Sequence, residues 1–292
     1  MSEQQSATAA PAPRISDRLA ILTAAVLFST GGAAIKACGL TAWQVASFRS
    51  AVAAIALVLL LPSARKRWSA RTLAVGVAYA ATVILFVLSN KLTTAANTIF
   101  LQDTAPLYVL LLGPLLLKEP IRRRDLLFMA ALAVGMLLFF VGHQATSVTA
   151  PDPMRGNVLA LVSGVAWALT LLGLRWLGRD GGGQAVPAVV FGNVTACLVA
   201  LPLALPVSHS TPADWLTIVF LGLVQIALAY AVLTRGMSRV PVLEASLLLL
   251  VEPVLNPVWA FAVHGEVPAP WAIAGAAIIL AATAAKTVLD RE

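Results

Sequence analysis

The segment from Leu101 to Glu119 reads LQDTAPLYVLLLGPLLLKE, an apolar run that carries the carboxylate Asp103 and the prolines Pro106 and Pro114. A second segment, Leu247–Glu266, reads LLLLVEPVLNPVWAFAVHGE and resembles the first. Each run is long enough to cross a bilayer as a helix, since a hydrocarbon core of about 30 Å needs about 20 residues. The recurrence of so unusual a pattern indicates an internal repeat.

The repeat extends over most of the chain. At one constant offset Pro106 falls on Pro253, and the alignment continues into the next apolar run, LLFMAALAVGM over IAGAAIILAAT. At a slightly shorter offset VLFSTGGAAIKA resembles VAWALTLLGLRW. We therefore expect two repeats, 14–145 and 150–290, behind a polar, proline-rich tail at 1–13 that is typical of a disordered segment.

The composition places most of the chain in lipid. It is 60% hydrophobic and only 11% charged, with a mean hydropathy of +0.89, whereas a soluble domain carries about 25% charged residues. Helical segments of about 20 apolar residues predict an all-α membrane protein with ten spans. Their expected bounds are 17–38, 41–61, 69–91, 94–117, 122–143, 153–177, 184–204, 212–235, 241–264 and 268–289.

The odd number of spans in each repeat determines the relative orientation of the repeats. A five-helix half that starts on one side of the membrane ends on the other, so the second half runs in the opposite sense. This predicts an inverted-topology repeat around a central cavity. Secondary transporters use such an arrangement to expose a midplane site to each side in turn.

The basic residues predict the orientation of the chain in the membrane. With cytoplasmic termini, 16 Lys and Arg lie on the inner side and 3 on the outer side, while Arg49 lies inside a span. The positive-inside rule therefore predicts a multi-pass membrane protein with both termini in the cytoplasm. Anionic membrane lipids are the expected partners of the basic loops. We expect no binding to nucleic acid.

The residues resemble those of a known family. An apolar helix with a central proline and a terminal glutamate, present once in each half, is similar to the EamA-type drug/metabolite transporter superfamily. VASFRSAVAAIALVLLL and IALAYAVLTRGMSRVPVLEASL resemble the same family. The resemblance implies a basket of ten helices, with the first, third, fourth, sixth, eighth and ninth around a central cavity. Within the superfamily, size and pattern are similar to the YddG-like bacterial amino-acid exporters, a resemblance that implies a place in the bacterial inner membrane.

Three charged residues lie well inside the predicted spans, and two prolines occupy matched positions in the two halves. A charge at the bilayer centre costs at least about 3 kcal/mol and normally faces a cavity or a partner. Asp103 and Arg49 lie at similar depth, so they form either a structural ion pair or part of a substrate site. Glu252 has no evident partner by depth. Pro106 and Pro253 lie near the midplane and free backbone groups there, which favours paired hinges over simple packing kinks.

Polar and aromatic side chains on the cavity helices predict a site for a small, partly polar solute. Such a site is mostly apolar with a few directed hydrogen-bonding groups, although each residue alone is also typical of helix packing. Gly31 and Gly32 should loosen the first span beside this set. The candidate cavity residues are Ser29, Thr30, Tyr79, Thr82, Asn97, Gln102, Ser163, Trp167, Gln225, Tyr230 and Asn256.

Small residues predict that the fifth and tenth spans pack against each other, because small side chains four apart let membrane helices approach closely. These residues are Ala131, Gly135, Ala277 and Ala281. Glu119 and Glu266 precede these two helices, where a carboxylate meets the positive end of a helix dipole. The cysteines and histidines are scattered and lack the spacing of a disulfide framework or a metal site.

These features favour a secondary transporter that exports small metabolites by alternating access, with amino acids, including aromatic and neutral ones, as the leading substrates. A multidrug or other metabolite exporter is the alternative within the superfamily. A lipid-modifying membrane enzyme is remote, because no His, Asp or Cys cluster lies near one membrane face. We expect no enzymatic activity, cofactor or metal, and function as a monomer.

Overall fold

The chain folds almost entirely into helices. The computed structural model describes residues 15–66, 68–105, 107–108, 111–112, 123–141, 146–179, 184–237, 240 and 248–289. Within these residues the only extended pairing is an isolated bridge between Ser147 and Ala150. The all-α fold expected from the composition is therefore confirmed.

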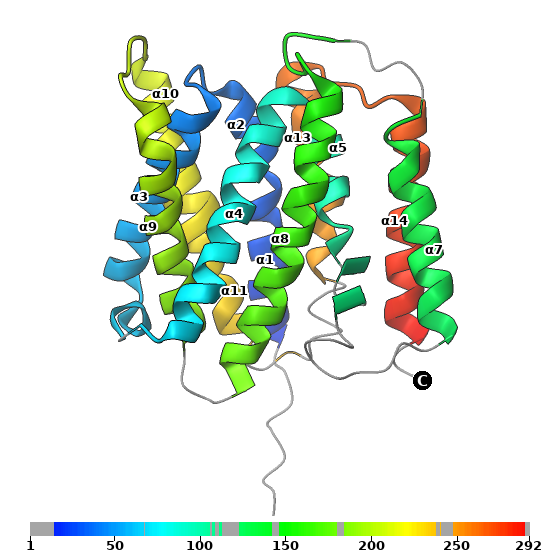
Figure 1. Ribbon diagram of the computed structural model, residues 1–292, viewed down its shortest axis with the longest axis horizontal. Coiled ribbons are helices and arrows are strands. Elements are labelled where there is room, and N and C mark those ends of the chain that lie inside the picture. The colour runs from blue at the N-terminus through cyan, green and yellow to red at the C-terminus, as the bar shows by residue number, and fades with distance from the viewer. Residues whose placement is uncertain are drawn as a thin grey trace, which may run out of the picture.

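Figure 1 shows the described helices in the order of the chain. In chain order they are α1 (Ile15–Ser29), α2 (Gly31–Ala37), α3 (Ala42–Leu60), η1 (Pro62–Arg65), α4 (Ala70–Leu92), α5 (Ala95–Gln102), α7 (Arg123–Leu138), α8 (Pro153–Arg179), α9 (Ala185–Ala204), α10 (Pro212–Val219), the π-helix η2 (Phe220–Leu228), α11 (Ala229–Met237), α13 (Val251–His264) and α14 (Pro270–Leu289).

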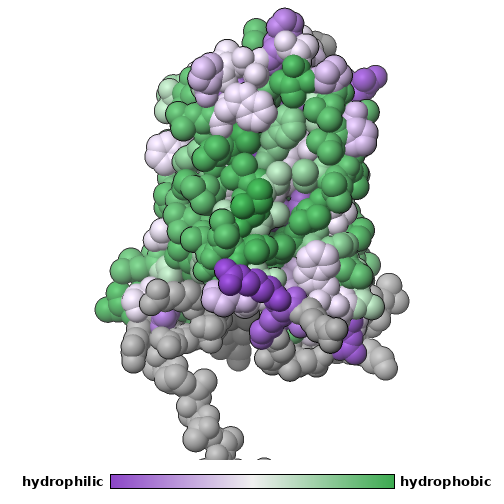
Figure 2. All heavy atoms as spheres, turned by 90° about the vertical axis from the view of Figure 1, so that its left-hand side faces the viewer, coloured by the Kyte–Doolittle hydropathy of each residue, from purple (hydrophilic) through white to green (hydrophobic). Residues whose placement is uncertain are grey.

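Six helical segments of the described chain are long and apolar enough to cross a membrane. Two shorter apolar helices, Asp125–Leu138 and Pro270–Lys286, accompany them. Large apolar side chains cover the outer surface, as in Leu127, which is 76% exposed. On the face that Figure 2 shows, apolar side chains form a broad band, with hydrophilic residues gathered toward the two ends of the molecule. A surface of this kind is solvated by lipid. The long helices are Ile15–Ala37, Ala42–Leu60, Ala70–Leu92, Pro153–Leu174, Ala185–Ala204 and Pro212–Leu233.

Capping boxes set the start of three of the long helical segments. The hydroxyls of Thr41, Ser69 and Thr211 each accept a bond from the backbone N–H three residues ahead, and the side chain there bonds back. A capping box satisfies two of the N–H groups that a helix start leaves unpaired. Helices that end close to lipid need this, because an unpaired backbone group there is costly.

The described helices place the ends of the chain at one end of the bundle. The start of α1 and the end of α14 lie together at the lower end in Figure 1, which we call the proximal end. The opposite, distal end holds the ends of α2 and α13 and the start of α10. The helices α1 and α8 run in opposite directions between these two ends.

The helices α7 and α14 pack against each other, as the small residues predicted (Figure 1). Of the expected residues, Gly135 lies at the contact on α7, whereas on α14 the contact is made by Gly275 rather than by Ala277 and Ala281. A Cβ on Gly135 would lie 3.0 Å from the Gly275 carbonyl oxygen, and a Cβ on Gly275 would lie 2.5 Å from that of Gly135. Ala277 and Ala281 are exposed on the other side of α14. The two glycines therefore allow the close approach.

Several expected continuous helices are interrupted. The first span breaks at Thr30 between α1 and α2, and α5 ends at Gln102 with Asp103 as its cap. A turn at Leu250 precedes α13, and the span beginning at Pro212 contains a π-helical stretch. Stretches of π-helix are rare in proteins, and those that do occur are often found at functional sites. The interruptions fall on helices that the sequence assigned to the cavity.

Candidate functional site

Two glycines at the break between α1 and α2 bring amide side chains close to the backbone. A Cβ on Gly31 would lie 2.8 Å from the Gln225 Nε2, and a Cβ on Gly32 would lie 2.6 Å from the Asn256 Oδ1. Gln225 comes from η2 and Asn256 from α13. The glycines thus admit polar groups from the second half of the chain against a helix of the first half.

The amide of Asn256 is fully buried, yet neither its oxygen nor its nitrogen has a hydrogen-bond partner among the described residues. The Gln225 Oε1 is likewise unpaired there, and its Nε2 makes only a long 3.5 Å bond to the Phe28 carbonyl. A buried polar group without a partner costs about 1–3 kcal/mol, so its retention calls for an explanation. A bound solute would supply the missing bonds. We call Gly31, Gly32, Gln225 and Asn256 the glycine–amide site.

The hydroxyls beside this site are already occupied. Ser29 and Thr30 donate to the carbonyls of Val26 and Leu27, each at 2.7 Å. Trp259 Nε1 in turn donates to the Ser29 Oγ at 2.9 Å. These bonds hold the turn at the end of α1 and tie it to α13. Trp259 did not stand out in the sequence, where it reads as one more aromatic residue in an apolar run.

A second group of predicted residues forms a chain of hydrogen bonds between α5, α8 and α4. Gln102 Nε2 donates to the Ser163 Oγ at 2.6 Å, and Ser163 Oγ donates to the Thr82 carbonyl at 3.2 Å. The Thr82 hydroxyl lies 3.2 Å from that of Thr170. These residues bond to one another, so the structure assigns them to helix packing. Trp167, which was also predicted to line the cavity, is half-buried on α8.

Arg49 lies in a third group, with tyrosines rather than with Asp103. It is 2% exposed, and its guanidinium donates to the Val83 carbonyl at 2.9 Å. Tyr79 and Tyr230 lie within electrostatic range, and their rings meet edge to face at 5.8 Å. No ion pair joins Arg49 to Asp103 in the part of the chain that the structure describes. Similar depth did not place the two on facing sides of their helices.

Asp103 lies near Glu252 instead. The carboxyl of Glu252 is within electrostatic range of Asp103, and Tyr230 is within range of both Glu252 and Arg49. Both acidic residues are half-buried, and no hydrogen bond or ion pair joins either side chain to another described residue. Two ionised carboxylates within electrostatic range of each other would repel in the membrane interior. A cationic group between them would relieve that repulsion. We call Asp103 and Glu252 the acid pair.

Of the two predicted hinge prolines, the structure describes only Pro253. Pro253 is buried in the first turn of α13, directly after the turn at Leu250. A proline is tolerated in the first turn because no helical hydrogen bond is lost there. Pro253 therefore marks the point where the helix restarts rather than a kink within it. Pro106 and Pro114 lie outside the described residues.

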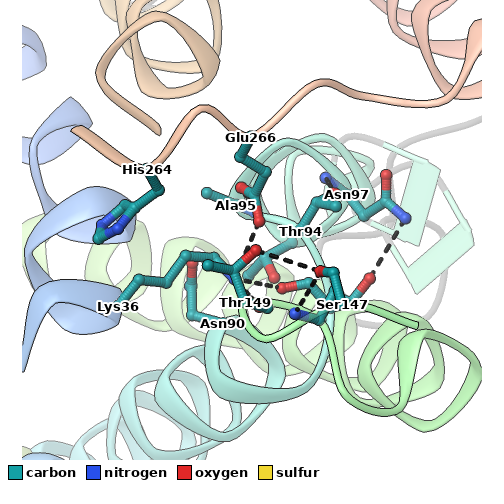
Figure 3. Close-up of polar contacts among 12 residues, drawn as sticks. Lys36, Asn90, Thr94, Ala95, Asn97, Ser147, Thr149, His264 and Glu266 are labelled. Atoms are coloured by element: carbon teal, nitrogen blue, oxygen red, sulfur yellow. Dashed lines mark hydrogen bonds and ion pairs between the residues drawn. The ribbon is translucent and has the colours of Figure 1, made fainter. Parts of the chain in front are cut away.

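The distal end holds a further polar cluster (Figure 3). Asn97 Nδ2 donates to the Asn157 Oδ1 at 3.0 Å, and the Thr93 hydroxyl donates to the same oxygen at 2.8 Å. Asn157 Nδ2 donates to the Phe139 carbonyl at 3.0 Å. Asn97 is thus part of a hydrogen-bond network at the end of the bundle. Asn157 was missed in the sequence, although an amide in an apolar helix was the available signal.

Glu266 belongs to the same cluster, and its expected role was wrong. We expected it to meet the dipole of the helix that follows it, α14. Its carboxylate instead accepts a bond from the Ala95 N–H at the start of α5, at 2.8 Å, and lies 3.2 Å from the Lys36 Nζ. Figure 3 shows the side chain turned away from the 265–269 connection and into the bundle. Glu119, its counterpart in the repeat, lies outside the described residues.

No group of three or more His, Cys, Asp or Glu side chains that could hold a metal ion occurs among the described residues. His264 is engaged with the Ala33 carbonyl, 2.9 Å from its Nε2. The candidate chemistry is therefore recognition by amides and carboxylates inside a helical bundle.

The chain belongs to the EamA-like transporter family, which matches it twice, over residues 18–141 and 154–286. It is accordingly a transporter of the drug/metabolite transporter superfamily rather than an enzyme. A threonine/homoserine exporter, RhtA, from Escherichia coli (strain K12) is 26% identical over 213 residues, which cover 71% of this chain and 68% of that protein. An uncharacterized transporter, YyaM, from Bacillus subtilis (strain 168) is 25% identical over 210 residues, 70% of this chain and 68% of that one.

A solved crystal structure has a similar fold. It matches this chain with a TM-score of 0.61 at 23% identity and covers 95% of this chain and 98% of that one. The likeness extends over nearly the whole of both chains and concerns the fold alone.

Proposed function

We propose that this protein is a secondary transporter that exports small metabolites, amino acids above all, across the bacterial inner membrane by alternating access. The two family matches, one in each half, support two repeats, 14–145 and 150–290. The opposite directions of α1 and α8 support an inverted relation between them (Figure 1). Such halves can rock about a site that lies between them.

The acid pair is the observation that carries the choice of an amino acid. Asp103 is contributed by the first half and Glu252 by the second, and neither is neutralised by Arg49. A substrate ammonium bound between the carboxylates would relieve their repulsion. Because the two carboxylates come from different halves, such a substrate would also bridge the parts that move.

The glycine–amide site supplies the groups that an amino acid needs at its other end. Asn256 lies one helical turn beyond Glu252 on α13, so the two side chains share a face of that helix. Its unpaired Nδ2 is a donor suited to a carboxylate, and its Oδ1 is an acceptor suited to a hydroxyl. The relative named as a threonine/homoserine exporter supports a substrate with both groups.

Counterflow in proteoliposomes tests the proposal. Labelled threonine should exchange against unlabelled threonine, whereas N-acetylthreonine, which lacks the ammonium, should compete poorly. Glu252→Gln should reduce threonine exchange and leave the weak competition by N-acetylthreonine unchanged. Asp152→Asn, which alters an exposed carboxylate in the connection before α8, is the matched control and should behave as wild type.

The same measurement tests the second candidate function, that of a multidrug exporter. The acid pair also supports this function, because two carboxylates could bind an organic cation. Tetraphenylphosphonium carries a positive charge and no carboxylate. Accumulation of this cation without exchange of threonine would replace the amino-acid proposal with the multidrug one. Exchange of neither compound would refute both.

The proposed orientation has its own test. Single cysteines at Lys66, near the proximal end, and at Ser208, near the distal end, are both on exposed residues. A membrane-impermeant maleimide added to whole cells should label only the Ser208 site. The native Cys38 should react slowly, because burial raises the pKa of its thiol. Labelling at Lys66 alone would reverse the orientation.

A further inference from the structure

A buried ion pair joins the two halves of the chain at the distal end. Lys36 Nζ, near the end of α2, lies 3.2 Å from the Glu266 Oε1, in the connection between α13 and α14. Their side chains are only 2% and 4% exposed. Figure 3 shows both reaching into the same cluster from opposite sides. The pair therefore differs from exposed surface ion pairs, which contribute little to stability.

Each partner also bonds to further backbone groups. Lys36 Nζ donates to the Thr93 carbonyl at 2.7 Å and to the Thr149 carbonyl. The second oxygen of Glu266 accepts from the Ala95 N–H at 2.8 Å. The pair therefore connects α2, the end of α4, the start of α5 and the 265–269 connection. Additional bonds of this kind are what a buried pair needs to offset its desolvation.

The pair lies on the distal side of the glycine–amide site, with Lys36 on α2 and Glu266 two residues after the end of α13. Lys36 follows Gly32 by one turn of α2, and His264 follows Asn256 by about two turns of α13. His264 is itself bonded to the Ala33 carbonyl of α2. Contacts between α2 and α13 thus run without interruption from the glycine–amide site to the distal end. A solute leaving the site toward that end has to pass where these helices meet.

We propose that Lys36 and Glu266 form a latch that closes the distal end and that breaks each time this end opens. The inference rests on the proposed alternating access, since it assigns the latch to one of the two states. When α2 and α13 separate, both ions become hydrated, which compensates for the lost pair. When they close, each ion needs the other, because a single buried charge is strongly unfavourable. The latch therefore makes closure depend on both halves meeting correctly.

Electron spin resonance between two nitroxide labels tests the latch without any substrate. The labels replace the exposed residues Ala37 and Val267, which lie beside the latch on its two sides. Cys38 and Cys197 are replaced by alanine. Wild type should give mainly the short, closed distance. Lys36→Met and Glu266→Gln should each raise the open-to-closed ratio, by about tenfold, within the usual range for coupled states.

The double variant distinguishes a latch from a general loss of packing. Lys36→Met keeps the apolar stem of lysine, and Glu266→Gln keeps an oxygen for the Ala95 N–H. With both charges removed, no ion remains to be buried, so the double variant should return toward the closed distance. Effects that add in the double variant, or single variants that stay closed, would overturn the proposal.

A matched control lies at the same end of the molecule. Arg155 and Asp152 form an exposed pair 3.1 Å apart, and Arg155→Met should leave the distance distribution unchanged. A shift as large as that of Lys36→Met would mean that any charge change at this end opens it, and would refute the latch. Because no transport is measured, the result stands apart from the threonine experiment. Failure of threonine exchange alone would leave the latch intact.

Discussion

Gly32 and Asn256 approach each other across the two halves of the chain so closely that a Cβ on the glycine would lie 2.6 Å from the amide oxygen. The same Cβ would lie 3.0 Å from the Cβ of Ala95. Only a residue without a side chain fits between α2, α5 and α13 at this point. This contact joins the break in the first span to the unpaired amide.

Gly32→Ala should therefore push these helices apart and impair transport. Overpacking of a tight contact costs about 1–3 kcal/mol, so thermal unfolding of the purified protein should occur at lower temperature, together with a slower exchange of substrate. Ala37→Ser, on an exposed residue at the end of the same helix, is the control and should change neither. Wild-type transport by Gly32→Ala would show that the close approach is dispensable.

Asn256→Leu should separate stability from function. The substitution removes an amide whose atoms are unpaired, so the unfolding temperature should stay the same or rise. Substrate affinity should fall by about 3- to 10-fold, the contribution of one hydrogen bond. Asn157→Leu is the contrasting control, because both polar atoms of Asn157 are bonded and their loss should destabilise the fold. A destabilised Asn256→Leu would indicate a structural role for that amide.

Asp103 and Arg49 should act independently. Because no ion pair joins them, the effects of Asp103→Asn and Arg49→Met on unfolding should add within about 0.5 kcal/mol. Arg49→Met and Tyr79→Phe, which alter neighbours, should instead deviate from additivity. Unfolding in detergent of the three single variants and the two double variants measures both cycles. Strong coupling between Asp103 and Arg49 would restore the ion pair considered from the sequence.

The contact between α7 and α14 should depend on glycines rather than alanines. Gly135→Leu and Gly275→Leu place a bulky side chain against the facing backbone, so each should lower the unfolding temperature. Ala277→Leu and Ala281→Leu point toward lipid and should be tolerated. Equal sensitivity of all four positions, read from thermal unfolding, would contradict the observed contact.

The overall bundle could be predicted from the sequence because hydrophobicity along the chain reports the solvent directly. Long apolar runs lie in lipid as helices, and the small residues of 126–136 and 273–283 indicated which helices would meet. The contact residues were less accessible to this reasoning. Gly275 and Ala277 are only two positions apart, yet they lie on different sides of α14. Which of these sides faces α7 is determined by the packing of the two helices and cannot be read from the sequence.

The candidate site was predicted as a set of residues but not as an arrangement. A sequence gives the depth of a residue in the membrane, whereas its neighbours depend on how each helix is rotated. Arg49 and Asp103 matched in depth and still belong to different groups. Glu266 was assigned to the helix that follows it, α14, whereas in the fold its carboxylate bonds to the start of α5.

The depth of the Lys36–Glu266 pair also determines how it responds to dissolved salt. At physiological ionic strength, ions screen exposed charges over about 8 Å, but they reach buried charges far less. The Arg155–Asp152 pair at the same end is open to such screening, since its side chains are 82% and 37% exposed. Changes in the salt concentration outside the membrane should therefore weaken the exposed pair and leave the buried one almost unaffected. A transporter closed by a buried pair keeps the same closing equilibrium in dilute and in saline surroundings.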